Sequence, residues 1–500
     1  MPSPLPCPPD PPDLAPAREG PVWTAVALGL SLPVLITLAV VLWRTPYPVS
    51  EAVALFEDAA RFPPSHFLAG DTAYYRPLYH LALGWIWRHA GPLDVRLAWV
   101  TALHVVPVVV LVVALVVHLR PRSAGEAGAA ALAAAVLVGS PGLRDNLEIP
   151  LAYTAVGMPL ALLAWMLLTG RRRPWTGAAV LALAVVAVGF KEQGLVIVPL
   201  VLVAWATRAP GASRALLVAL LAATVAYLAF RVASREHWDG FEQAVGIGFR
   251  EIEPREANAR FGAFPYPVYA YNAAATMASV LFSEPTRGVF GITWMIGQRQ
   301  ARPWEYLHLL SSLALTTLIA WWCVDRLRAT VRAGWAWSPE SRAALALAGV
   351  LLACGALSFN YSRDRLGGMA APFYAASAYF AVRAAADRAL AASRARLVAT
   401  GLLLCALGVA WQMRAIGTIE YSRFVAARNQ FEWLTQPASR RKDFADRPVY
   451  LDIMNAMVAQ GVVPDAPRPT RYPHWATRLI SLPWDTNICS SVADGTCWPR

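Results

Sequence analysis

Long runs of apolar residues recur along the chain and are separated by short polar segments. Each run is continuous and approaches the roughly 20 residues with which a helix crosses the hydrocarbon core of a bilayer. A membrane-spanning barrel would instead show short alternating segments. The pattern predicts an all-α polytopic membrane protein with about eleven transmembrane helices. We expect them at 23–43, 95–118, 127–143, 150–169, 175–190, 194–207, 214–231, 306–324, 342–359, 368–384 and 397–413.

The arginines between these runs predict the topology. They gather in segments that alternate along the chain, at 120–122, 171–173, 208–214, 326–342 and 383–396. Lys and Arg are enriched in cytoplasmic loops. We therefore expect a multi-pass protein of the inner (plasma) membrane and cell envelope, with a cytoplasmic N-terminus and an extracytoplasmic C-terminus. The same loops account for the net charge of +12, so that charge does not indicate a nucleic-acid partner; the partner it predicts is the lipid bilayer.

The remaining segments complete the expected domain organisation. Residues 1–22 are rich in proline and lack a basic start, which predicts a disordered cytoplasmic N-terminus rather than a cleaved signal. The transmembrane domain at 23–413 has two large outer loops, at 44–94 and 232–305. Within these loops, 74–89 and 265–283 resemble helices that lie along the membrane surface. Residues 414–500 form a small extracytoplasmic C-terminal tail, where Cys489 and Cys497 would form a disulfide in an oxidising compartment.

Composition agrees with this class. Only 15% of the residues are charged, whereas soluble domains carry about a quarter.

Lys191 and Lys442 are the only lysines. Lys191 ends an apolar run, directly before Glu192, and ionisable residues at such depth are functional candidates. The alternative is a lysine that reaches the membrane surface and pairs with its neighbour.

Several carboxylates lie on the predicted outer face. Glu51 and Asp58 are seven residues apart and so share one face of a helix. A carboxylate just outside the membrane suits the general base that takes a proton from an acceptor hydroxyl or amine. From spacing alone, a solvated amphipathic helix is the more common explanation. Asp145 and Glu148 occupy another outer turn and are either acids of the same cavity or parts of an ordinary polar turn.

Two short motifs carry a resemblance. Tyr-Arg-Pro-Leu at 75–78 resembles the signature of the transmembrane-and-tetratricopeptide O-mannosyltransferases and their bacterial relatives, and Phe-Lys-Glu-Gln-Gly at 190–194 resembles a second element of that family. Both occur in matching order, and the resemblance covers about residues 20–210. It points to the GT-C superfamily of membrane glycosyltransferases. The chain departs from the family at Ser50-Glu51, where paired aspartates are usual, and it carries no tetratricopeptide array.

The resemblance implies a GT-C type bundle that transfers a hexosyl or pentosyl group, with inversion, from a polyprenyl-phosphate donor at the extracytoplasmic face. It makes Glu51 the first choice for the acceptor-activating base, with Asp58 and Asp71 as rivals. Such a donor needs cations that hold its phosphate. The available outer cations are Arg76, Lys191, Arg144, Arg363 and Arg365, of which Arg76, Lys191, Arg363 and Arg365 are the candidates for holding the phosphate. The acids expected beside them are Asp145, Glu148 and Glu192.

Other classes stay open. A transporter or flippase of lipid-linked glycans should place ionisable residues near the bilayer midplane and often shows repeated halves. The apolar runs are nearly free of charge and no repeat is visible, which favours the enzyme. A polymerase or ligase of lipid-linked glycans would share the donor chemistry. No Cys or His spacing predicts a metal site and no cofactor is indicated; the sugar, the acceptor and any assisting divalent metal stay open.

Overall fold

The computed structural model describes residues 20–435 except 44–50, 70–74, 141, 144–152, 235–244, 248–249, 253, 263–265, 283–295, 298, 300–302 and 363, together with residues 455 and 459. Helices occupy all of the predicted spans. They are α1 (Gly20–Trp43), α5 (Leu93–Leu119), α6 (Ala124–Val138), α8 (Tyr153–Thr169), α9 (Thr176–Phe190), α10 (Ile197–Ala206), α11 (Arg214–Ala233), α15 (Pro303–Arg332), α16 (Pro339–Leu357), α17 (Ala371–Ala392) and α18 (Arg394–Thr435).

Six of the described helices are long and apolar enough to cross a membrane: α1, α5, α11, α15, α16 and α18. The prediction of a multi-pass membrane protein is therefore supported. The helices α6, α8 and α9 and the segment Glu192–Ala206 are also apolar, but they are shorter than the length that a membrane crossing requires. The predicted count of about eleven spans is therefore not confirmed. The helix α18 continues to Thr435, well beyond residue 413, where we expected the last span to end.

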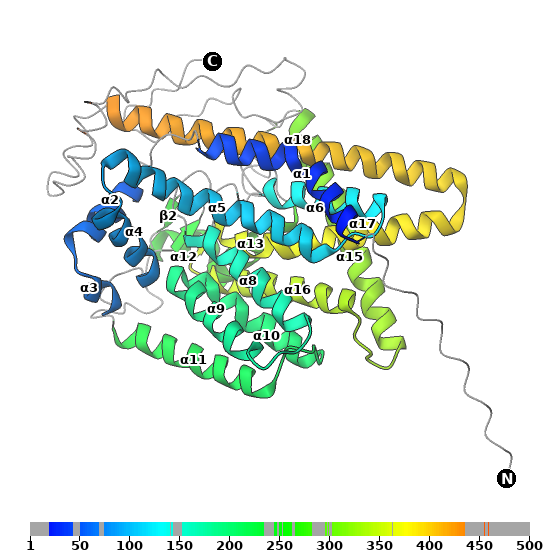
Figure 1. The fold of residues 1–500 in the computed structure, drawn as a ribbon, viewed down its shortest axis with the longest axis horizontal. Helices are drawn as coiled ribbons and strands as arrows, with labels where there is room; N and C mark the ends of the chain where they lie inside the picture. Colours follow the sequence, from blue (N-terminus) through cyan, green and yellow to red (C-terminus); the bar gives the residue numbers. More distant parts are fainter. Residues whose placement is uncertain are drawn as a thin grey trace, which may run out of the picture.

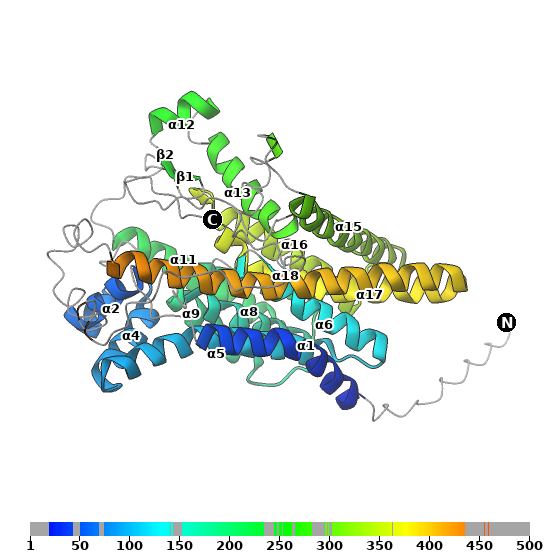
Figure 2. The ribbon, with the colours of Figure 1, turned by 90° about the horizontal axis from the view of Figure 1, so that it is seen from above.

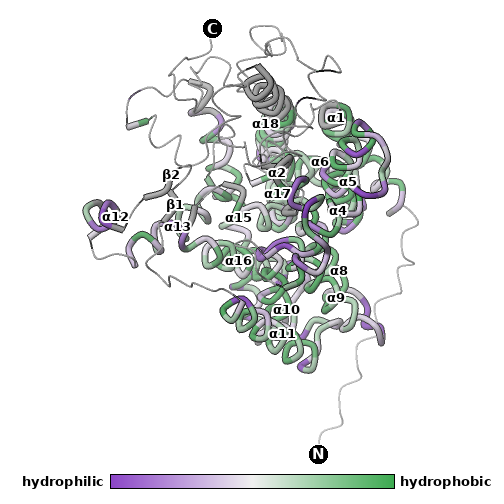
Figure 3. The backbone as a smooth tube through the Cα atoms, turned by 90° about the vertical axis from the view of Figure 1, so that its left-hand side faces the viewer, coloured by the Kyte–Doolittle hydropathy of each residue, from purple (hydrophilic) through white to green (hydrophobic). Residues whose placement is uncertain are grey.

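The long helices run roughly side by side, and the two ends of the bundle differ in content (Figures 1 and 2). At one end, on the left of Figure 1, lie α2 (Glu51–Arg61), α3 (Pro64–Leu68) and α4 (Pro77–His89). We call this the α4 end. The turn between α17 and α18 lies at the opposite end, which we call the arginine end. Figure 3, seen from the α4 end, shows that the bundle helices are mostly hydrophobic.

The centre of the bundle is the contact between α6 and α17. Nearly every residue of α6 from Ala127 to Val138 is buried, and so are most residues of α17 from Ala371 to Val382. Both segments are rich in alanine, and small side chains allow the backbones of two helices to approach closely. Glu126 and Arg383 pair across the same contact, with 3.3 Å between Oε1 and Nε.

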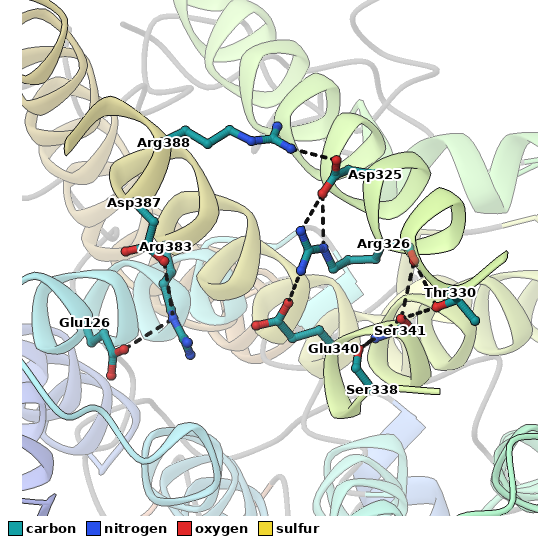
Figure 4. A network of polar contacts seen from close by, with 10 residues as sticks. All are labelled: Glu126, Asp325, Arg326, Thr330, Ser338, Glu340, Ser341, Arg383, Asp387 and Arg388. Carbon is teal, nitrogen blue, oxygen red and sulfur yellow. Dashed lines mark hydrogen bonds and ion pairs between the residues drawn. The ribbon is translucent and has the colours of Figure 1, made fainter. Parts of the chain in front are cut away.

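A network of charged side chains links α15, α16 and α17 at the arginine end (Figure 4). Asp325 of α15 accepts hydrogen bonds from Arg326 at 2.5 Å and from Arg388 of α17 at 2.6 Å. Arg326 also donates to Glu340 of α16 at 3.1 Å. All four side chains are partly exposed, and such pairs contribute only about 0–1 kcal/mol each. The network therefore orients the helix ends more than it stabilises the fold.

The predicted outer loop 232–305 contains secondary structure that we did not expect. Its strands β1 (Val245–Ile247) and β2 (Arg250–Ile252) are antiparallel, and β1 also pairs in parallel with β3 (Tyr361–Ser362). The order of this small sheet is β2-β1-β3. The loop also forms α12 (Pro254–Phe261) and α13 (Tyr266–Leu281). The helices that we predicted at 265–283 and 74–89 are present as α13 and α4, and their position along the membrane surface stays a prediction.

The close approach of the turn after α10 to the end of α8 gives a test of the fold. A Cβ atom on Gly211 would lie 2.4 Å from the carbonyl oxygen of Leu167, which is backbone and cannot move aside easily. We expect Gly211→Ala to lower the free energy of unfolding by about 1–3 kcal/mol, because overpacking strains both segments. Gly177→Ala is the matched control, since a Cβ there meets no atom within 4 Å. Equal thermal unfolding midpoints for the two detergent-solubilised variants would contradict the described turn.

Candidate functional site

The Tyr-Arg-Pro-Leu motif forms the start of α4. Arg76 is the N-cap residue, and Pro77 occupies the first helical position. Proline suits this position because its fixed φ is already helical and its missing N–H would have no partner there. The side chain of Arg76 is 11% exposed. The motif thus sets both the direction of α4 and the place of the guanidinium beside it.

The Phe-Lys-Glu-Gln-Gly motif forms the turn between α9 and α10. Lys191 is extended, and the 3-10 helix η1 (Glu192–Val196) follows it directly. The amide of Gly194 donates to the carbonyl of Lys191 at 2.8 Å. A Cβ on Gly194 would lie 2.4 Å from the backbone of Ala187 and Val188, so only glycine allows the chain to fold back this tightly. The turn buries Lys191, which is 3% exposed.

The structure brings these two motifs together. The Nε of Arg76 lies 3.9 Å from Oε2 of Glu192. A Cβ on Gly189 would lie 2.7 Å from the side chain of Leu78, so the two segments are in close contact. Phe190 packs on the apolar cluster that contains Tyr79. A cation and a carboxylate that are more than a hundred residues apart in the chain are therefore neighbours at the α4 end.

The C-terminal end of α11 lies beside the Tyr75 side chain. The ring of Tyr75 lies 5.2 Å from that of Phe230 and 6.4 Å from that of Tyr227, measured between centroids. The guanidinium of Arg231 lies 5.3 Å from the centre of the Tyr75 ring, within the range of a cation–π contact. Aromatic faces and arginines thus surround the Arg76–Glu192 pair.

The structure places the other predicted site residues as follows. Asp58 is half-buried on α2, which packs against α4, and Glu51 is the first residue of that helix. Arg365 belongs to the 3-10 helix η2 (Asp364–Ala370), which contacts η1. The side chains of Glu51 and Arg365 lie outside the described part. Outside the described residues altogether are Asp71, Arg144, Asp145, Glu148, Arg363, Cys489 and Cys497.

Two buried polar residues of this region were not among the predicted site residues. Glu57 is 2% exposed on α2, and His80 is 5% exposed on α4. The ring of His80 stacks on that of Phe67, with centroids 4.5 Å apart. In the sequence, Glu57 follows the apolar Val53 by four residues and so shares a helix face with it, a signal that could have indicated the burial of Glu57.

His80 sits in an environment that opposes a positive charge. Burial, then the charge of Arg76, then that of His66 lower the pKa of His80 from 6.5 to about 4. The imidazole is therefore neutral at neutral pH and adds no second cation beside Arg76. Among the described residues, no group of three or more His, Cys, Asp or Glu side chains is placed to hold a metal ion.

No protein-family model, no curated protein and no solved structure matches the chain. What the fold itself defines is a helical multi-pass membrane protein. Its candidate site lies at the end of the bundle where α2, α4, η1 and the end of α11 gather.

The low pKa of His80 predicts a pH-dependent stability. The unfolded chain binds a proton at His80 below about pH 6.5, whereas the folded protein does so only near pH 4. The stability that neutral His80 contributes is present above pH 6.5 and is lost as the pH falls toward 4. The loss should reach about 2–3 kcal/mol at pH 4.5.

Thermal unfolding of wild type and His80→Phe at pH 7 and pH 4.5 measures this effect. We expect the variant to lose less stability than wild type, because phenylalanine keeps the stack on Phe67 and cannot bind a proton. His89→Phe, at an exposed position of the same helix, should behave as wild type does. An identical pH dependence for wild type and His80→Phe would show that His80 does not contribute.

Proposed function

We propose that the protein is a GT-C type glycosyltransferase that moves a hexosyl or pentosyl group from a polyprenyl-phosphate donor to an acceptor at the extracytoplasmic face. The observation that carries this proposal is the meeting of the 75–78 and 190–194 motifs, through Arg76 and Glu192. These are the motifs on which the resemblance to membrane O-mannosyltransferases rests. Their contact is what a shared site at one membrane face requires.

Arg76 and Lys191 would hold the donor phosphate, and Arg365 would join them from η2, which contacts η1. The departing polyprenyl phosphate gains negative charge as its bond to the sugar breaks. Fixed cations in a partly water-free site stabilise that charge strongly. Burial of Lys191 and near-burial of Arg76 favour this role, since neither cation is fully hydrated. Glu192 would orient Arg76, and Asp145 and Glu148 are further acids expected at the same face.

A carboxylate on the preceding loop would act as the base. Glu51 is our first choice, and Asp58 on the same helix and Asp71 are the rivals. The base takes the proton of the acceptor hydroxyl or amine while that atom attacks the anomeric carbon. The bond to the phosphate oxygen breaks on the opposite side, so the configuration inverts and polyprenyl phosphate leaves. Because α2 packs against α4, the helix that begins at Glu51 lies next to the helix that Arg76 caps.

The topology proposed with this function places the arginine end in the cytoplasm, as loops rich in arginine favour. The α4 end is then extracytoplasmic, the N-terminus is inside and the C-terminus is outside. The shorter apolar helices and α17 would complete about eleven crossings. A helix in the interior of a bundle can be shorter and more polar than one that faces lipid, because neighbouring helices surround it.

A transporter or flippase of lipid-linked glycans is the second candidate. The observation that favours it is Arg414, which is completely buried in the apolar part of α18. Ionisable residues within membrane spans often mark transport pathways. A polymerase or ligase of lipid-linked glycans would use the same donor site with a larger acceptor.

The test is sugar transfer by the full chain in proteoliposomes. A panel of polyprenyl-phosphate hexoses and pentoses, radiolabelled in the sugar, is offered together with a membrane extract that supplies the acceptor, and loss of label from the polyprenyl carrier is measured. We expect Glu51→Gln to lower turnover about 100-fold or more while the protein stays folded, because general-base catalysis contributes factors of that size. Arg76→Gln should also lower it.

Glu340→Gln at the arginine end is the control and should keep wild-type turnover. Full activity of Glu51→Gln would remove Glu51 from the role and make Asp58→Asn and Asp71→Asn the next variants. Lipid-linked sugar that crosses the bilayer without being cleaved would instead identify a flippase.

A further inference from the structure

Two turns at the arginine end are fixed to each other through the backbone. They are the turn between α8 and α9 (residues 170–175) and the turn between α10 and α11 (residues 207–213). The amide of Gly211 in the second turn donates to the carbonyl of Leu168, just before the first turn, at 2.9 Å. The two turns therefore form one continuous surface, at the ends of α9 and α11 that lie away from the candidate site.

Five exposed arginines lie on or directly beside these turns. They are Arg171, Arg172, Arg173, Arg208 and Arg214, and we call them the arginine surface. Among the described residues, none of the five forms an ion pair. The chain has no Asp or Glu at 149–191 or at 193–235, so neither turn supplies a carboxylate. Gathered positive charges repel one another, and an anion bound among them would relieve that repulsion.

Other arginines at the same end have partners within the fold. Arg326 and Arg388 both pair with Asp325, and Arg383 pairs with Glu126 (Figure 4). The arginine surface has no such carboxylate in the described part of the chain. Its charges are therefore accessible to an anion that comes from outside the protein.

Exposed tryptophans border the arginine surface. Trp175 is 47% exposed and Trp205 is 43% exposed. The guanidinium carbon of Arg173 lies 5.4 Å from the centre of the Trp175 ring. Tryptophan favours the headgroup level of a bilayer, where its ring contacts apolar chains and its N–H contacts polar groups. Arginines and tryptophans at one level indicate a surface that meets lipid headgroups.

The helix α11 offers an apolar surface that begins directly at this level. Val218 and Leu221 follow Arg214 by four and seven residues, so the three share one face of the helix. Both apolar side chains are exposed, and so is Leu202 on α10, which packs against α11. A molecule with a negative headgroup at Arg214 can therefore lay apolar chains along α11. This combination favours a lipid over a soluble anion or an acidic protein.

We propose that the arginine surface binds the headgroup of an anionic phospholipid whose acyl chains lie along α11. Arginine suits this role because it is always charged and offers paired N–H groups to phosphate oxygens. Clusters of basic residues beside membrane helices attract anionic headgroups in the same way. The proposal uses none of the residues assigned to sugar transfer, so it does not depend on the proposed function.

Lipid binding to the full chain in a nonionic detergent tests the proposal. Native mass spectrometry measures binding of two lipids: dioleoylphosphatidylglycerol, which is anionic, and dioleoylphosphatidylcholine, which has no net charge. We expect the anionic lipid to bind about tenfold more tightly or better. Arg171→Gln, Arg172→Gln and Arg173→Gln combined should lower that affinity about tenfold or more, because each arginine contributes a factor of about five. Binding of phosphatidylcholine should not change.

The matched control removes three exposed arginines elsewhere at the same end, by Arg328→Gln, Arg332→Gln and Arg396→Gln combined. It loses the same charge and should keep the wild-type affinity for phosphatidylglycerol. Equal losses in the two triple variants would show a response to net charge alone and would overturn the site. Should the first triple variant not fold, Arg208→Gln with Arg214→Gln decides, and wild-type affinity in that variant would refute the proposal.

Two further outcomes would overturn the proposal. Equal affinity of the wild-type protein for the two lipids would show that headgroup charge is not recognised. Full displacement of phosphatidylglycerol by glycerol 3-phosphate, which has no acyl chains, would identify a site for a soluble phosphate instead. We expect no such displacement, because the acyl chains gain contacts with α11 that the free headgroup cannot make.

Discussion

The alanine-rich contact between α6 and α17 is the interaction on which the rest of the structure depends. Inside a bilayer, helices gain little from hiding apolar surface, because lipid is as apolar as they are. Close van der Waals packing has to hold them together, and alanines permit it. The helices α1 and α5 pack on α6, and α15, α16 and α18 pack on α17. The two central helices thus organise both halves of the bundle.

The charges at the two ends of the bundle behave differently. At the arginine end, each charged side chain of the network has a partner of opposite charge on α15, α16 or α17. These side chains are Asp325, Arg326, Glu340 and Arg388. At the α4 end, Lys191 is buried by a glycine-dependent turn, and Arg76 meets Glu192 at 3.9 Å, a long distance for an ion pair. The first arrangement aligns helices. The second gathers two cations and a carboxylate around one turn.

The break between α9 and α10 shows how the fold accommodates that second arrangement. Irregular backbone at membrane depth is tolerated only where protein or water surrounds it. Here η1 packs against α8, α16 and η2, and its residues Gln193 and Gly194 are buried. Continuing α9 directly into α10 would have removed the turn that buries Lys191. The interruption between α9 and α10 is therefore what places Lys191 and Glu192 at the candidate site.

The apolar runs along the sequence were enough to identify the class of the protein and the position of nearly every helix, because a bilayer requires long apolar helices whatever their neighbours are. The sequence also indicated Lys191, Glu192 and Arg76 one by one. We did not predict from it the three short strands, the burial of Glu57 and His80, or the place of Arg414 between α15 and α18. Burial and contact depend on which helix faces which, and residues more than a hundred positions apart carry no local signal of meeting. The resemblance placed the 75–78 and 190–194 motifs at one face, but it took the folded chain to show that Arg76 and Glu192 lie 3.9 Å apart.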